Sequence, residues 1–396
     1  MSSVGLPKRR AAAKRVSVVV PYYRRIANLR RMLDALVEQD MPKDEFEVVI
    51  GCLEYSTELV QAVASLNGAL AVRCVMAGEH WNVARARNLA LRQAEAEVLL
   101  LLDADMLLPR EFLSRLYSTY FARGQRNAVV GQMLNYDEAA DVAADDPGAG
   151  AEYGSRQLRT NSRLGLGHDV RWTIERNIPW ALCWTAVVAL PRSALDEYAL
   201  FFDADFQGWG VEDTEWAYRL HLAGIPIVFA DDLWAIHLPH PRDVARNHQD
   251  EARNFRRFIA KWPNQDTEIV ASFGDVGSNR QYRFIRELTS QMSGSGVELC
   301  LVEFRVSGEL MLAIGVECTR GDAQVVDSAV KRLWAGADHV RPLPLVGFAL
   351  PYETGVLARS YLLPAVRTAP EDLKTRIEAE ARRVSRQSIE IEAREK

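Results

Sequence analysis

The segment VLLLLDADMLLP, residues 98–109, is the stretch from which the fold can be worked out. Its first five residues are all apolar, so they predict a strand that is buried on both faces of a sheet. Short apolar runs of this kind recur upstream and alternate with amphipathic stretches: VSVVV (16–20), NLRRMLDALVEQ (28–39), FEVVIGCL (46–53), TELVQAVASL (57–66), LAVRCVM (70–76) and ARNLALRQA (86–94). This alternation predicts an α/β fold with a mostly parallel central sheet.

The carboxyl ends of the predicted strands are where a ligand is expected to bind. In open parallel α/β sheets, ligands bind in the crevice beyond these ends. The residues that follow Val20, Ile50 and Leu102 are therefore candidate site residues before any motif is considered.

Length and composition describe an ordered globular chain. It has 396 residues, 48% of them hydrophobic and 26% charged, which excludes intrinsic disorder and gives room for two domains. The formal net charge of −5 provides no overall positive field, so a nucleic-acid partner is not expected. The longest uncharged apolar stretch, residues 178–190, is shorter than the roughly 20 residues of a membrane span, so we expect none.

The cysteines carry no metal or redox motif. They number five, lie far apart in the sequence, and include no Cys-x-x-Cys pair. They stand at positions 52, 74, 183, 300 and 318. This pattern favours a reducing cytoplasm as the location.

Changes in composition divide the chain into three parts. We expect residues 1–15 to be a disordered basic tail, residues 16–265 an α/β domain, and residues 270–396 a smaller α+β domain. In the last part, VELCLVEFRV (297–306) and ELMLAIGVEC (309–318) predict paired strands around a Ser-Gly turn. A helix is predicted at AQVVDSAVKRLW (323–334), and a charged helix from Glu371 onward is expected to end the domain.

Two acidic residues follow the strand of the opening segment. Asp103 and Asp105 are two positions apart at the strand's end, so their side chains can point the same way and converge on one hard cation. The alternative is that one of them caps the next helix and the other is solvated.

A second cluster lies about a hundred residues later, in FFDADFQGWGVEDTEWAYRLHLAG (201–224). Gly208 and Gly210 let the backbone turn tightly beside the large ring of Trp209. Glu212 and Asp213 then open an amphipathic helix, where acidic residues are also common for dipole reasons alone.

The motifs in order resemble the family 2 glycosyltransferases of the GT-A fold. They are VSVVVPYYRR (16–25), FEVVIGCLEYST (46–57), WNVARARNLAL (81–91), LLLLDADM (99–106) and GWGVEDTEWAYRL (208–220). The last also resembles the catalytic segment of β-1,4-galactosyltransferases and of chondroitin-type polymerases. The resemblance covers residues 16–254 and implies that the domain over 16–265 is a GT-A catalytic domain.

The resemblance implies which residues bind the donor. Pro21 and Tyr22 would contact the nucleoside, and Glu54 stands where the family usually has an aspartate that reads uracil. Arg87 and Asn88 match the family's Ala-Arg-Asn step, in which the arginine neutralises diphosphate charge or orients the loop beneath it.

The resemblance also implies a metal site for Mn²⁺ or Mg²⁺. Asp103 and Asp105 would hold the cation against the donor diphosphate, with Asp105 as the direct ligand. A third ligand is expected at His237 or His240. The pattern of chondroitin-type relatives favours His237 and that of galactosyltransferases favours His240; we favour His237.

Asp213 is the general base that the resemblance implies. A positioned carboxylate takes the proton of the acceptor hydroxyl as the new bond forms, and in-line attack inverts the anomeric centre. Glu212 would bind sugar hydroxyls, Trp209 would form an apolar wall against a sugar face, and the adjoining Gly210 would also belong to the donor site.

The sequence thus predicts a metal-dependent, inverting glycosyltransferase that uses a nucleotide sugar, with UDP as the expected carrier. A retaining transferase is one alternative, and a non-catalytic sugar-binding protein of the same fold is another. A nucleotidyltransferase is disfavoured, because PYYRR after the first strand lacks the glycine-rich signature of that class.

The acceptor bears a hydroxyl, but its class stays open. Five arginines precede Trp180 and are expected either to bind an anionic acceptor or to be solvated. They are Arg156, Arg159, Arg163, Arg171 and Arg176. Because residues 270–396 contain few candidate catalytic residues, we expect that domain to serve homodimerisation or acceptor presentation.

Overall fold

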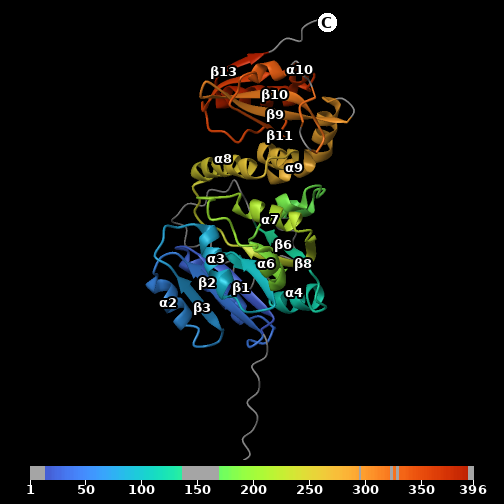
Figure 1. Cartoon of the computed structure of the whole chain (residues 1–396). Coiled ribbons are helices and arrows are strands. Elements are labelled where there is room, and N and C mark those ends of the chain that lie inside the picture. Colours follow the sequence, from blue (N-terminus) through green and yellow to red (C-terminus); the bar gives the residue numbers. More distant parts are fainter. Residues whose placement is uncertain (1–13, 136–168, 294–295, 322–323, 327–329, 391–396) are drawn as a thin grey trace, which may run out of the picture. The chain divides into compact units, whose positions relative to one another are not determined.

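The computed structural model describes the chain except for residues 1–13, 136–168, 294–295, 322–323, 327–329 and 391–396 (Figure 1). Most of the basic tail, together with Arg156, Arg159 and Arg163, lies outside the described residues. The described residues form two compact units, one within Met1–Thr173 and Cys183–Asp250 and one within Ile174–Leu182 and Glu251–Lys396. The domain boundaries drawn from composition stay a prediction.

The first unit is built on an eight-stranded sheet in the order β3-β2-β1-β4-β7-β6-β8-β5. The strands are β1 (Val16–Tyr22), β2 (Phe46–Cys52), β3 (Val72–Met76), β4 (Val98–Leu102), β5 (Met106–Leu107), β6 (Ala128–Leu134), β7 (Val187–Pro191) and β8 (Ile227–His237). The four neighbours β3, β2, β1 and β4 are parallel, β7 is antiparallel to β4, and β6 is parallel to β8. The predicted α/β class and the predicted strands β1 to β4 are confirmed.

Helices connect these strands and cover the sheet. They are α1 (Ile26–Val37), α2 (Thr57–Ala64), α3 (Val83–Gln93), α4 (Phe112–Tyr120), α6 (Arg192–Tyr198) and α7 (Glu212–Leu222), with a short 3-10 helix, η1 (Val170–Trp172). The strand order reverses direction after β3, so right-handed crossovers place α1 and α2 on one face and α3 on the other. Glycine at position 51 of β2 allows α3 to approach closely, because a Cβ there would lie 1.9 Å from the carbonyl oxygen of Ala86.

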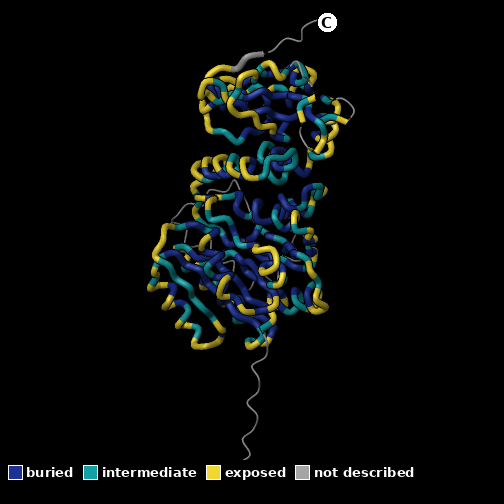
Figure 2. Tube along the Cα trace, in the orientation of Figure 1, coloured by how far each residue is buried: buried dark blue, intermediate teal, exposed yellow. Residues whose placement is uncertain are grey.

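The core of the first unit lies between the sheet and its helices. All residues of β1, β2 and β4 are buried, as the dark tube in Figure 2 shows. Such continuous burial explains why these strands are mostly apolar rather than alternating between apolar and polar residues. Among the described residues, no helix combines the length and the apolar character that a membrane span requires.

The second unit contains a five-stranded sheet in the order β11-β9-β10-β12-β13. Its strands are β9 (Val297–Val306), β10 (Glu309–Thr319), β11 (His339–Leu343), β12 (Leu357–Leu362) and β13 (Ser385–Glu390). Its helical elements are η2 (Pro179–Leu182), α9 (Gln265–Gln291), η3 (Val330–Trp334), α10 (Pro364–Arg367) and α11 (Glu371–Val384), and α8 (Val244–Lys261) begins in the first unit and ends in the second. The smaller α+β fold is therefore confirmed, including the β9–β10 hairpin that turns at Ser307 and Gly308.

Two local predictions in the second unit are wrong. The helix predicted over 323–334 is absent from its described part: Val325 forms an isolated bridge with Cys318, and only Val330–Trp334 is helical, as 3-10 turns. Two β-branched residues at 325 and 326 favour the extended backbone seen there. The charged helix from Glu371 does form, but it ends at Val384, and β13 continues beside β12.

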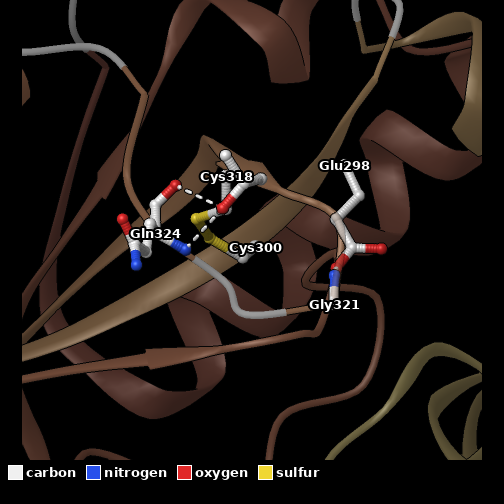
Figure 3. The surroundings of a disulfide bond; sticks show 6 residues. Glu298, Cys300, Cys318, Gly321 and Gln324 are labelled. Atoms are coloured by element: carbon white, nitrogen blue, oxygen red, sulfur yellow. Dashed lines mark hydrogen bonds between the residues drawn. A yellow bond between two sulfur atoms is a disulfide. The ribbon is translucent and has the colours of Figure 1, made fainter.

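A disulfide joins Cys300 of β9 to Cys318 of β10 (Figure 3). The two residues are 18 positions apart in sequence, and antiparallel pairing of the strands brings their Cα atoms to 6.2 Å. Disulfides are rare in a reducing cytosol. The cytoplasmic location stays a prediction, and a reducing cytoplasm does not account for this disulfide.

Candidate active site

Three strand ends place the expected donor-binding residues at one edge of the sheet. Pro21 and Tyr22 are the last residues of β1, Asp103 directly follows β4, and Glu54 lies two residues beyond β2. Glu54 does not stand free, since its carboxylate accepts a hydrogen bond at 3.3 Å from Nε of Arg24, and both side chains are exposed. An arginine thus accompanies the acidic residue that was expected to read the base.

Asp105, His237 and His240 form one cluster. The antiparallel pairing of β5 with β8 sets His237 opposite Met106, and the amide of Leu238 donates to the carbonyl of Asp105 at 2.8 Å. Oδ2 of Asp105 lies 3.2 Å from Nε2 of His240 and 4.0 Å from Nε2 of His237. The structure brings both candidate histidines to the same carboxylate, so it does not separate the two alternatives.

The charges around Asp105 keep it ionised. Its burial disfavours the charged form, but the hydrogen bond from His240, the neighbouring His237 and Arg25 outweigh burial and hold the pKa of Asp105 well below its usual range. Arg25, which was not expected here, donates to Oδ2 of Asp105 at 2.7 Å. Burial lowers the pKa of His237 to about 4, so at neutral pH its imidazole is uncharged, as a metal-binding histidine must be.

This donor set fits a divalent cation. One atom from each of Asp105, His237 and His240 lies within 4.8 Å of the others, and all three side chains are mostly buried. A carboxylate oxygen with two imidazole nitrogens suits a first-row transition ion such as Mn²⁺ better than Mg²⁺, which takes oxygen ligands almost exclusively. Asp103 is not one of the three residues that meet there, and its carboxylate pairs with Arg87.

Arg87 is a buried bridge at the centre of the site. Its Nη2 atom lies 3.0 Å from Oδ1 of Asp103, and its Nη1 atom lies 2.9 Å from Oε1 of Glu212. Only 4% of the residue is exposed. Of the two roles expected for Arg87, this position favours orientation of the surrounding loop over direct contact with a diphosphate.

Glu212 and Asp213 open α7, as predicted from the sequence. Asp213 accepts a hydrogen bond from the amide of Thr214 at 2.8 Å and another from the backbone of Thr185, just before β7. Burial and the neighbouring charge of Asp213 raise the pKa of Glu212 to about 7. Burial also raises the pKa of Asp213, against the opposing charge of Arg87. The pair therefore offers proton acceptors that are stronger bases than ordinary carboxylates.

Helix α3 holds the segment that leads to α7. Asn88 donates to the carbonyl of Phe202 and accepts from its amide, both at 2.8 Å. Asn82, the N-cap of α3, donates to the carbonyls of Ala204 and Phe206 at 3.1 and 2.8 Å. Asn88 was expected to contact the donor; the structure places its amide against backbone. The role of Asn82 was missed, although an asparagine before an amphipathic run is a recognisable cap signal.

The arginines before Trp180 do not form an exposed patch in their described part. Arg171 is 1% exposed and pairs with Asp169, so it is neither solvated nor available to an anionic acceptor. The expectation for Arg171 was therefore wrong, because a sequence cannot distinguish a buried ion pair from a surface charge.

Comparison with known proteins identifies several that are similar to this chain. A sequence model described as "Glycosyl transferase family 2" matches residues 17–169. Validoxylamine A glucosyltransferase of Streptomyces hygroscopicus subsp. jinggangensis (strain 5008) is 31% identical over 297 residues, which cover 71% of this chain and 70% of that protein. Chondroitin synthase of Escherichia coli is 26% identical over 253 residues, 59% of this chain and 36% of that protein. Among solved structures, a mannosyltransferase of Pyrobaculum calidifontis has a TM-score of 0.45 at 22% identity, covering 63% of this chain and 64% of that chain.

Proposed function

Because the chain belongs to glycosyl transferase family 2, we propose that this glycosyltransferase moves a sugar from a UDP-sugar to an acceptor hydroxyl, with a divalent cation and with inversion at the anomeric carbon. The observation that carries the proposal is the meeting of Asp105, His237 and His240 at the edge of the sheet where Asp103 and Asp213 also lie. These are the groups that such a transfer needs: a cation site, and a base on the neighbouring helix.

The residues have separate tasks in this proposal. Asp105 with His237 and His240 would hold Mn²⁺ or Mg²⁺, and Asp103 lies beside them at the end of β4. When bound, such a cation acts as a Lewis acid that stabilises the negative charge developing on the departing nucleoside diphosphate. Pro21, Tyr22 and Glu54 would then bind the nucleoside, with the Arg24–Glu54 pair next to the base.

Asp213 is the general base in this proposal. It is partly exposed, so an acceptor hydroxyl can reach it, and its raised pKa makes it a better proton acceptor than an ordinary aspartate. The hydroxyl proton passes to Asp213 while the oxygen attacks the anomeric carbon and the bond to the diphosphate breaks. Glu212 stays bound to Arg87 and binds sugar hydroxyls with its remaining acceptor capacity.

The second unit is proposed to serve homodimerisation or acceptor presentation. It contains its own sheet and core, while the cation cluster and the pair Glu212–Asp213 belong to the first unit. Sedimentation of the whole chain at several concentrations tests the dimer; a monomer throughout would leave acceptor presentation as the remaining role.

A thermal-shift screen of nucleotide sugars with and without Mn²⁺ tests the donor. A ligand at 100 times its Kd stabilises the folded state by about 2.7 kcal/mol, which such a screen detects. Glucosyl donors come first, because the relative that is 31% identical is named a glucosyltransferase. A shift that requires both UDP-sugar and Mn²⁺ supports the proposal, and transfer that persists in excess chelator overturns its metal requirement.

Analysis of the product's anomeric configuration tests the stereochemistry. NMR of the product from a donor of known configuration should give the inverted linkage. Retention would remove Asp213 from the role of general base for in-line attack. Binding of the donor without any transfer would instead favour the non-catalytic alternative.

A further inference from the structure

Gly208 lies against a carboxylate from a distant part of the chain. A Cβ at this position would lie 2.1 Å from Oδ2, 2.3 Å from Cγ and 2.8 Å from Oδ1 of Asp250, in helix α8. The backbone of Gly208 is also in the left-handed region, with φ of 78°. The glycine is therefore required by the approach of one specific carboxylate, in addition to the turn itself.

The same carboxylate binds the next residue along the chain. The amide of Trp209 donates to Oδ2 of Asp250 at 3.3 Å, and Asp250 is 8% exposed. This hydrogen bond fixes the peptide plane between Gly208 and Trp209 and therefore the direction in which the Trp209 side chain leaves the backbone. Because Trp209 is 37% exposed, core packing restrains only part of its ring.

The turn continues directly into the helix that carries the acidic pair. Gly210 and Val211 have φ of 84° and 72°, and α7 begins at Glu212 without a side-chain cap from Val211. A β-branched residue in the left-handed region is strained and persists only where the surroundings fix it. The contact with Asp250 is one such restraint, placed three residues before the strained valine.

We propose that Asp250 is a positioning residue for sugar transfer, which fixes the Gly208–Gly210 turn and with it the orientation of Trp209 and the start of α7. This inference rests on the proposed function, in which Trp209 lines the sugar site and Asp213 accepts the proton. Asp250 acts on the sugar end of the substrates. The residues proposed for the nucleoside end, Pro21, Tyr22 and Glu54, lie instead at the end of β1 and just beyond β2.

The test compares Asp250→Ala, Asp250→Asn and a structural control, Ser17→Ala. Ser17 is a buried residue at the opposite end of β1, where it donates to Glu47 and accepts from the amide of Ala96, so its loss destabilises the same unit away from the site. We expect Asp250→Ala to lower kcat/KM for transfer by at least about tenfold, since small misplacements of reacting groups are that costly. UDP affinity in the presence of Mn²⁺ should stay within about twofold, and Asp250→Asn, which keeps one acceptor oxygen, should restore most of the turnover.

The proposal would be overturned by an Asp250→Ala enzyme as active as the parent, or by a loss of activity that Ser17→Ala matches at equal loss of thermal stability. A parallel loss of UDP affinity in Asp250→Ala would also overturn it, because the effect would then not be confined to the sugar end.

A second readout does not depend on activity. Hydrogen exchange of the peptide containing Trp209 should speed up in Asp250→Ala and not in Ser17→Ala. Gly208→Ala should destabilise the parent more than it destabilises Asp250→Ala, because removal of the carboxylate makes room for the new Cβ. If hydrogen exchange of the Trp209 peptide speeds up and Gly208→Ala costs less stability in Asp250→Ala, but no nucleotide sugar is turned over, the proposed function fails while the positioning role stands. If neither effect appears, the positioning role fails.

Discussion

Nη1 of Arg87 lies 2.9 Å from Oε1 of Glu212, and both side chains are buried. The other terminal nitrogen of the same guanidinium reaches Asp103 at 3.0 Å. One side chain of α3 therefore joins the end of β4 to the first turn of α7, which are 109 residues apart by the numbers of Asp103 and Glu212. The geometry of the candidate base depends on this bridge.

Replacement of Arg87 by methionine should destabilise the first unit by about 3 kcal/mol, because it leaves the buried carboxylate of Glu212 without its cation. The pKa of Glu212 is already raised to about 7, and loss of the cation raises it further. An acid with a raised folded-state pKa loses stability as the pH rises through that pKa. In urea unfolding, the free energy of unfolding of Arg87→Met should therefore fall further below that of the parent above the pKa of Glu212 than below that pKa.

The control is Arg85→Met on the same helix. Arg85 pairs with Glu79 on the exposed face of the helix, so its loss should lower the free energy of unfolding by less than about 1 kcal/mol. Equal losses for the two variants, or a loss for Arg87→Met that does not change with pH, would contradict the role of the bridge.

The features that could be predicted from the sequence are those encoded locally. Short, mostly apolar runs predicted β1 to β4, and the acidic residues after Val211 were correctly placed in the first turn of α7. Partners across the sheet could not be predicted, because they depend on register. The pairing of Met106 with His237 brings both histidines to Asp105. The pairing of β9 with β10 likewise brings Cys300 to Cys318.

Replacement of Asp213 by asparagine should abolish transfer while donor binding stays within a few fold. A general base acts in the transition state, so its loss lowers kcat by about 10² to 10⁴ without a matching change in ground-state affinity. Initial rates and equilibrium titration with the donor measure the two quantities. A variant that keeps its turnover, or that loses donor binding to the same extent, would remove Asp213 from this role.

Replacement of Asp105 by asparagine should weaken metal-dependent donor binding itself. Asp105 is the only carboxylate of the described three-residue cluster, and its charge attracts the cation. Titration of Mn²⁺ followed by electron paramagnetic resonance measures this binding directly. Asp34→Asn, an exposed residue of α1, serves as the control and should bind Mn²⁺ like the parent.

The histidines can be separated by the same titration. If one of His237→Ala and His240→Ala loses Mn²⁺ binding and the other retains it, the ligand is identified. If Asp105→Asn binds Mn²⁺ as the parent does, the proposed site is wrong.

The pH dependence of transfer should show an acid limb above the range of an ordinary aspartate. Burial raises the pKa of Asp213, so the base becomes protonated, and the rate falls, at a higher pH than a solvated carboxyl would require. Because Asp213 and Glu212 interact, the limb reports the pair. Replacement of Glu212 by glutamine removes the second titrating group of the pair, so the limb that remains should report Asp213 alone and still lie above the range of an ordinary aspartate. A limb in the range of a free aspartate, unchanged in Glu212→Gln, would contradict this account.

Reduction of the Cys300–Cys318 bond should destabilise the hairpin of β9 and β10. A bridge between residues 18 positions apart lowers the entropy of the unfolded chain and so stabilises the folded state by about 3 kcal/mol in the loop-entropy estimate. Wild-type protein treated with a strong reductant isolates the bond, because both sulfurs remain in the core. Hydrogen exchange of the two strands should then speed up, and it should do so at least as much in Cys300→Ala/Cys318→Ala, which also removes both sulfurs from the core. Cys74→Ala, which removes an unbonded cysteine of the first unit, is the control and should leave that exchange unchanged. If the reductant does not change exchange in β9 and β10, the bond does not contribute to the stability of the second unit.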